Sequence, residues 1–318
     1  MRMKKFFTAM FGLAFALLVA WALTKQGGSV KEMVELEHKR FDAPALWKVT
    51  DKDSTLYLFG TVHLLPEDMK WQKRDMLAAF DEAGTVFFES PDDTKAAFKT
   101  KVLQRQYGLY GSGEQLNHHL DRVNINRLTA AALNTNVPLG SLVRFKPWLV
   151  SDLLTTAAAE QAGLSYENSA DNWLRQKARK QHKHIEALDG VETYFKAVAQ
   201  QPESVQLRSL KKTLNNFDQL VPDLKTVNAA WLVGNTALLE DELLKPFQQR
   251  SPEIFSALIV NRNADWARKL DAFMQKDDDA FVAVGIAHML GEDGLPARLA
   301  EMGYKVERVR RTDLPNEK

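Results

Sequence analysis

The residues with the clearest chemical potential lie in two similar stretches, "GTVHLLPED" (60–68) and "GIAHMLGED" (285–293). Each stretch carries a Gly-x-x-His motif, and each directly follows a hydrophobic run typical of a buried strand. In open parallel sheets, ligands bind beyond the carboxyl ends of the strands. Glycine at such an end lets the backbone turn sharply and approach a ligand closely. His63 and His288 are therefore predicted to meet at one edge of a sheet.

A third ionisable residue, Glu89, closes the apolar run "TVFF" (85–88). Two imidazoles and one carboxylate form the ligand set of hydrolytic zinc sites, and they also suit manganese, cobalt or iron. A metal ion with an open coordination position lowers the pKa of a bound water and supplies hydroxide near neutral pH. We therefore predict a divalent metal site made of His63, Glu89 and His288. The alternative is that each histidine is a hydrogen-bonded structural residue.

Arg262 and Asn263 form a further candidate pair in a helix that is predicted to open at Ser251-Pro252. Arg262 falls on a stripe that recurs every four residues and is otherwise apolar: Ile254, Leu258, Trp266 and Leu270. A guanidinium in such a place is costly unless it is paired or hydrogen-bonded. Either Arg262 pairs with a core carboxylate, or it binds a substrate carboxylate or stabilises an oxyanion, with Asn263 as its helper.

Predicted strands alternate with predicted helices at both ends of the chain, and these elements position the candidate residues. Hydrophobic runs bounded by turn residues predict strands, and 3.6-residue periodicity predicts helices. From about 93 to 275 the pattern is mostly helical, apart from one short strand. The predicted strands cover 45–50, 54–60, 85–90, 184–189, 280–285 and 304–309, and helices are expected before Gly84 and after Asp293.

This pattern predicts an α/β fold with a central, mostly parallel sheet built from both ends of the chain and a large helical insertion. Residues 45–318 form one domain in this interpretation, with the insertion at about 93–275. Residues 24–44 are expected to be a polar linker. The formal charge of +1 argues against nucleic-acid binding, and the absence of cysteine excludes disulfides and a thiol nucleophile.

The N-terminal residues 1–23 have the pattern of an export signal. Three basic residues precede an uncharged apolar run, 6–23. The run is also long enough to span a bilayer, so cleaved signal peptide and retained transmembrane anchor are both open. Either alternative predicts a periplasmic or other extracytoplasmic domain, tethered to the inner membrane if the segment is retained.

At these residues the chain resembles the TraB/PrgY/GumN family, which includes the Tiki proteins. The resemblance runs from Ala45 to about Val309, and its strongest blocks contain the two Gly-x-x-His motifs, "TVFFE", "FKPW" and "NRNADWARKL". It implies a fold like that of the erythromycin-esterase and haem-binding-lipoprotein superfamily. For the Tiki branch it implies a metal-dependent peptidase that uses both motif histidines and the glutamate. Those roles carry over to His63, His288 and Glu89, and Arg262 with Asn263 match the family's Arg-Asn pair.

The chain departs from the family pattern at two places. It has Ser169-Ala170-Asp171 where relatives show Gly-hydrophobic-Asp, and Leu188-Asp189 followed by Tyr194 where relatives show Leu-Glu and a glutamine. The departures leave the roles of Asp171 and Asp189 open.

Three hypotheses follow from the sequence. The first is an exported metal-dependent hydrolase of the metallopeptidase kind, acting on a peptide or a small molecule. The second is a metal-independent, esterase-like hydrolase in which a motif histidine acts as general base on water and Glu89 orients it, as the resemblance to erythromycin esterase suggests. The third is a non-catalytic binding protein of the cell envelope. The sequence gives no prediction of the oligomeric state.

Overall fold

The structure is a computed structural model that describes residues 43–276 and 278–309. The predicted leader, 1–23, and nearly all of the linker, 24–44, lie outside these described residues. Among the described residues, no helix is long and apolar enough to cross a membrane.

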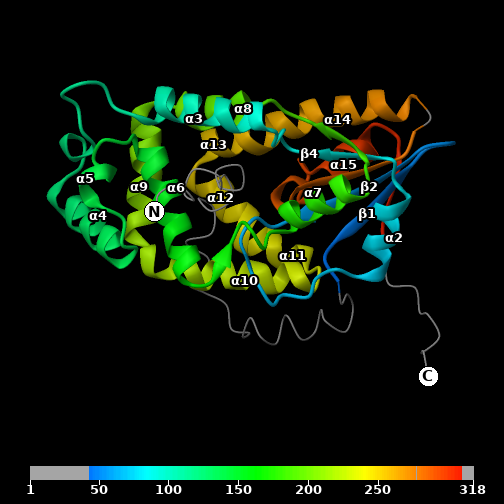
Figure 1. Ribbon diagram of the computed structural model, residues 1–318, viewed down its shortest axis with the longest axis horizontal. Helices are drawn as coiled ribbons and strands as arrows, with labels where there is room; N and C mark the ends of the chain where they lie inside the picture. The colour runs from blue at the N-terminus through cyan, green and yellow to red at the C-terminus, as the bar shows by residue number, and fades with distance from the viewer. Residues whose placement is uncertain (1–42, 277, 310–318) are drawn as a thin grey trace.

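A six-stranded sheet forms one end of the molecule (Figure 1). Its spatial order is β6-β4-β7-β2-β1-β8, and the neighbours β6/β4, β4/β7 and β7/β2 run parallel, whereas β1 runs antiparallel to β2 and β8. The bounds are β1 Leu46–Thr50, β2 Thr55–Thr61, β4 Thr85–Phe88, β6 His184–Ala187, β7 Ala280–Gly285 and β8 Lys305–Arg308. The predicted mostly parallel sheet from both ends of the chain is confirmed, because the late strand β7 lies between the early strands β2 and β4.

The two central strands explain why their sequences are continuously apolar. Every residue of β4 and of β7 is buried, which is the pattern of a parallel strand covered on both faces. The edge strand β6 is mostly exposed and has a polar sequence. A separate two-stranded ribbon pairs β3, Leu65–Pro66, with β5, Leu164–Ser165.

Helices fill the segment between β4 and β7, as predicted, and extend the molecule away from the sheet (Figure 1). Two further helices flank the early and late strands, α2 (Arg74–Glu82) and α15 (Leu295–Glu301). The insertion contains α3 Thr94–Gly108, α4 Arg122–Asn134, α5 Leu139–Leu142, α6 Pro147–Gln161, α7 Ala170–Lys180, α8 Val191–Ala199, α9 Glu203–Asn215, α10 Leu220–Leu232, α11 Thr236–Leu239, α12 Lys245–Arg250, α13 Pro252–Phe255 and α14 Asn261–Met274. Short turns join them, including two π-helical ones, η5 Glu240–Leu244 and η6 Ser256–Val260.

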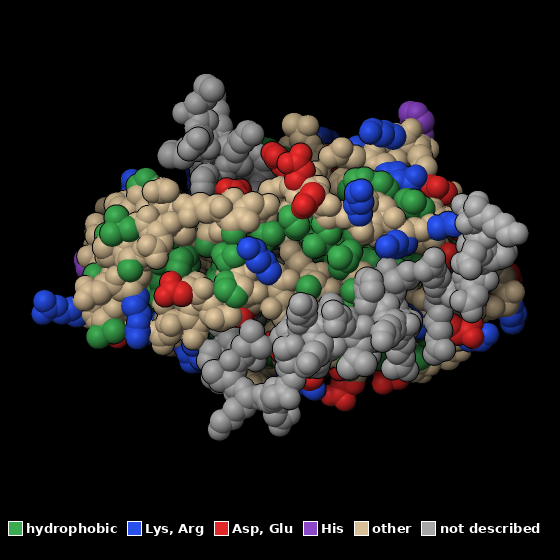
Figure 2. Space-filling model, turned by 90° about the horizontal axis from the view of Figure 1, so that it is seen from below, with side chains coloured by type: hydrophobic (Ala, Val, Ile, Leu, Met, Phe, Trp, Pro, Cys, Tyr) green, Lys and Arg blue, Asp and Glu red, His purple; other side chains and the backbone are tan. Residues whose placement is uncertain are grey.

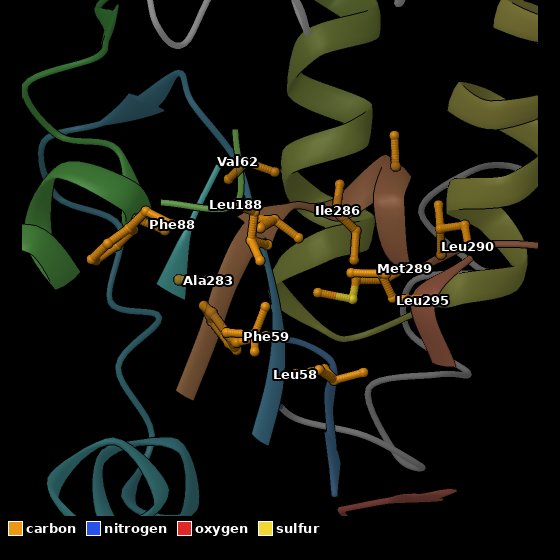
Figure 3. Packing of buried hydrophobic residues seen from close by; sticks show 14 of the residues in the cluster. Leu58, Phe59, Val62, Phe88, Leu188, Ala283, Ile286, Met289, Leu290 and Leu295 are labelled. Carbon is orange, nitrogen blue, oxygen red and sulfur yellow. The ribbon is translucent and has the colours of Figure 1, made fainter. Parts of the chain in front are cut away.

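Two hydrophobic clusters hold the chain together. The larger one packs helices on both faces of the sheet, and Figure 3 shows its side chains around β2, β4 and β7. The smaller one lies within the insertion and joins residues of α4, α5, α6 and α9. Helix α6 contributes to both clusters, with Leu149 in the larger and Leu154 in the smaller. On the side where α10 and α11 lie, hydrophobic side chains gather across the middle of the surface (Figure 2).

The first motif glycine, Gly60, is required by packing. A Cβ atom at this position would lie 2.2 Å from Cδ1 of Ile286 and 3.0 Å from its Cα. Ile286 belongs to η7, Ile286–Met289, the turn that follows β7 and carries the second motif. The missing side chain therefore lets the two Gly-x-x-His segments lie against each other.

Candidate active site

His63 leaves the sheet two residues after β2 and is 6% exposed. Its Nδ1 lies 2.7 Å from Oδ2 of Asp171, in the first turn of α7, and the other Asp171 oxygen accepts a 2.7 Å hydrogen bond from the Thr61 hydroxyl. Because the carboxylate can only accept, Nδ1 carries the proton and Nε2 faces the centre of the site. Burial lowers the pKa of His63, but the Asp171 and Glu89 carboxylates outweigh it and raise the pKa above its usual value.

His288 lies in η7, beyond the end of β7, and is held in a comparable way. Its Nδ1 lies 2.6 Å from Oδ1 of Asn263, whose amide nitrogen donates to the backbone oxygens of His288 and Asp293. These bonds fix the amide orientation, so Nδ1 is the donor here too. The ring packs on Trp266, with the centroids 4.4 Å apart. Burial, with help from Arg262, lowers the pKa of His288 to about 3, so this imidazole is neutral.

Glu89 follows β4 directly and faces both histidines. Its Oε1 lies 4.0 Å from Nε2 of His63 and 3.9 Å from Nε2 of His288, and accepts a 2.8 Å bond from the backbone N–H of Gly285. Its Oε2 accepts a 2.7 Å bond from Arg262. Burial raises the pKa of Glu89, but Arg262 and the two histidines together hold it well below its usual range. Glu89 is therefore ionised.

Arg262 neutralises two buried carboxylates. Nη2 donates to Glu89, Nε donates to Asp189 at 2.7 Å, and Nη1 lies 3.3 Å from Nε2 of His288. The guanidinium also stacks over Trp266, 4.5 Å from the ring centre. Of the two alternatives set out above, the structure shows pairing with core carboxylates, and Asn263 supports His288 rather than Arg262.

The fold explains why these residues meet. Because β2, β7, β4 and β6 are parallel neighbours, the residues that follow them lie at one edge of the sheet. Helix α10 holds the backbone on both sides of His63. Trp231 donates to the Gly60 carbonyl at 2.7 Å, and Asn228 donates to the Leu64 carbonyl at 2.8 Å.

Sequence reasoning left the roles of Asp171 and Asp189 open. Asp189 lies two residues after the end of β6, beside Glu89, and its backbone N–H donates to the Glu89 carbonyl at 2.8 Å. Ligand sites lie beyond the carboxyl ends of parallel strands, and Asp189 stands at the end of the predicted strand 184–189, so this rule points to Asp189 as well. Asp171 reaches His63 from a helix, and no local pattern in the sequence points to that contact.

The residue types at the predicted metal site suit a divalent metal ion, but their ligand atoms lie farther apart than those around a bound zinc ion. Both histidines have Nδ1 hydrogen-bonded to an oxygen, the arrangement that orients Nε2 toward a metal ion. Ligand atoms around one tetrahedral zinc ion lie about 3.4 Å apart, whereas both Nε2 to Oε1 distances are 3.9–4.0 Å. Within residues 43–276 and 278–309, no group of three or more acidic or histidine side chains is arranged to hold a metal ion as it stands.

The sequence profile of the TraB/PrgY/gumN family matches residues 45–308, which include every residue of this site. The chain belongs to the TraB/PrgY/gumN family. The resemblance carried by the two motifs is thereby confirmed, and the distances given above describe how a TraB/PrgY/gumN sequence assembles its motif histidines.

Two relatives of the chain are both described as uncharacterized protein YbaP. One, from Escherichia coli (strain K12), is 26% identical over 269 residues, which cover 83% of this chain and 95% of the relative. The other, from Shigella flexneri, is 27% identical over 248 residues, covering 76% and 87%. No solved structure matches the chain.

Proposed function

We propose that this protein is a hydrolase whose reactive centre lies between His63, Glu89 and His288. The observation that supports it is convergence: residues following three different strands direct two imidazole Nε2 atoms toward one oxygen of Glu89. Hydrogen bonds that the two rings donate to Asp171 and Asn263 orient them before any substrate arrives. Such preorganisation of buried polar groups is typical of a site that stabilises developing charge.

In the first form of the proposal the hydrolase depends on a divalent metal ion, Mn, Co, Zn or Fe, held by His63, Glu89 and His288. Such an ion would lower the pKa of a bound water and polarise the scissile carbonyl. Asp171 and Asn263 keep the two Nε2 atoms unprotonated and directed inward. Arg262, paired with Glu89 and beside His288, would add a positive charge that favours negative charge developing at this centre. That the substrate is a peptide rests on the resemblance to the Tiki branch.

A second form needs no metal ion and is favoured by a different contact. The positive charge beside Glu89 and His288 is already supplied by the Arg262 guanidinium. His63 then takes a proton from water through Nε2, and Asp171 stabilises the imidazolium that forms. This is the esterase-like alternative, with Asp171 rather than Glu89 as the group that orients the base.

Digestion of a peptide library with the purified chain tests the proposal. Cleavage should be lost in His63→Ala and in Glu89→Gln, and retained in the control His184→Ala, whose side chain is 68% exposed. Loss of cleavage on chelation, restored by one of the four metal ions, supports the first form. Cleavage that resists strong chelators supports the second. No cleavage by folded wild-type protein of any peptide or ester offered would contradict both and favour the non-catalytic binding protein.

We also propose that the domain acts outside the cytoplasm, on the evidence of the sequence at 1–23. The mass of the mature N-terminus in the native host tests this. A mass that corresponds to a chain beginning near residue 23 indicates a cleaved signal. The mass of the full chain, found in the membrane fraction, indicates an anchor. The full mass in the soluble cytoplasmic fraction would contradict export.

A further inference from the structure

The outer face of α3 combines positive charge with exposed apolar side chains. After its capping residue Asp93, the helix contains four basic residues and no acidic one: Lys95, Lys99, Lys101 and Arg105. Lys99 forms an ion pair with Glu192 of α8. No ion pair joins the other three to any other residue that the structure describes.

Phe98 and Val102 lie among these charges. They are 70% and 45% exposed, and Phe98 is one of the two most exposed large hydrophobic residues in the described part of the chain. Because they are four residues apart, they lie one above the other on the same helical face. The opposite face of α3 provides the buried residues Ala96, Thr100 and Leu103. Neither Phe98 nor Val102 belongs to the two hydrophobic clusters, so together they form an apolar pair on the outer face of α3.

We propose that the outer face of α3 binds the surface of an anionic lipid bilayer. An interfacial helix places its apolar side chains at the headgroup boundary while flanking lysines and arginines contact acidic headgroups. Helix α3 lies on the outer edge of the molecule, against α8 (Figure 1), so a flat surface can reach it. Charge complementarity selects the acidic headgroup as the ligand. The face of one helix is also small for a stable protein interface, which needs about 800 Å² from each partner.

The absence of cysteine allows a direct test with the full-length chain. A polarity-sensitive fluorophore attached to Phe98→Cys reports the surroundings of α3 alone. Its signal does not depend on whether the N-terminal residues are themselves bound to the vesicle. We expect its emission to shift to the blue on vesicles that contain phosphatidylglycerol. The shift should be absent with phosphatidylcholine alone and should disappear at high salt, because screening removes the attraction between surface charges.

The matched control is Leu133→Cys on α4, a leucine that is 72% exposed. Its label should keep its aqueous emission on the same vesicles. The triple variant Lys95→Glu/Lys101→Glu/Arg105→Glu, which leaves the Lys99 ion pair intact, should abolish the shift at position 98 without changing the melting temperature. No blue shift at position 98, an equal shift at position 133, or an unchanged shift in the charge-reversed chain would each overturn the proposal.

Discussion

At the scale of single residues, Arg262 is the group on which the other charges of the site depend. It is 6% exposed and holds Glu89 and Asp189 at 2.7 Å each. Removing one member of a buried ion pair leaves its partner uncompensated, which costs about 3–5 kcal/mol. We expect Arg262→Met to lower the free energy of unfolding by that amount in urea titrations.

Arg268 is the matched control for this prediction. It lies on the same helix and pairs with Asp265, but its side chain is 70% exposed. Arg268→Met should cost less than about 1 kcal/mol, because exposed pairs contribute little. Equal losses in the two variants would show that the buried pairs do not stabilise the site.

Asp152 is a second residue with an energetic consequence. It is fully buried in α6, accepts a 2.6 Å bond from the Tyr194 hydroxyl through Oδ2, and has no partner in the described chain for Oδ1. Burial raises its pKa from 3.8 to about 8. The folded state therefore binds a proton that the unfolded state releases, so this group makes stability fall as the pH rises between these two values.

Asp152→Asn should flatten that dependence, because the amide stays neutral and can still accept from Tyr194. The wild-type slope from this group is up to about 1.4 kcal/mol per pH unit. Melting temperatures measured across the window from 3.8 to about 8 check it. A variant whose melting temperature falls as steeply as that of the wild type would contradict the assignment.

The convergence of His63, Glu89 and His288 could be predicted because each follows a strand, and parallel strands end at one edge. The residues that orient them could be predicted less well. Asn263 was matched through the family motif, yet its partner proved to be His288. The contact of Asp171 with His63 depends on where the insertion places α7, and this is a tertiary property that no local pattern encodes.

At the scale of elements, the contact between Gly60 and Ile286 joins β2 to the turn after β7. Gly60→Ala would push a methyl group into Ile286, and overpacking of this kind costs about 1–3 kcal/mol. Thermal melting should show the loss. Gly84→Ala is the control, because a Cβ at Gly84 meets no atom within 4 Å. Ile286→Val removes the Cδ1 atom that clashes and should partly rescue Gly60→Ala; failure of the rescue would place the strain elsewhere.

The helix predicted to open at Ser251-Pro252 shows where periodicity succeeds and where it falls short. The stripe recurs every four residues, and all five of its members are buried, as predicted. A regular helix would turn such a stripe steadily around its axis. The chain instead changes to a π turn at 256–260 between α13 and α14, and its wider turn keeps Arg262 on the buried face. Hydrophobic spacing does not distinguish this from one continuous α-helix.

At the scale of the whole molecule, the separate cluster in the insertion predicts two levels of stability. Leu128 is 1% exposed within that smaller cluster, and Leu→Ala at such a place costs about 2–5 kcal/mol. We expect Leu128→Ala to speed amide hydrogen exchange in α4 and α9, with β2 and β7 still protected. Equal acceleration in β2 and β7 would show that the insertion and the sheet unfold as one unit.

The general architecture could be predicted because alternating strands and helices at the two ends of a chain can pair in few ways. The arrangement of the insertion could not. The order in which α3 to α13 pack depends on long-range contacts such as those of α6 with α9 and α10, and amphipathic spacing gives the buried face of a helix without naming its neighbour.

The place of β7 has a consequence for how this protein is made. Ribosomes release the N-terminal strands first, so β2 and β4 are complete long before residues 280–285 exist. Until then the two early strands have no common neighbour, and nothing brings His63 close to Glu89. A nascent chain therefore lacks the cluster of His63, Glu89 and His288, and a message cut short before codon 280 yields a polypeptide that has the first Gly-x-x-His motif without this cluster.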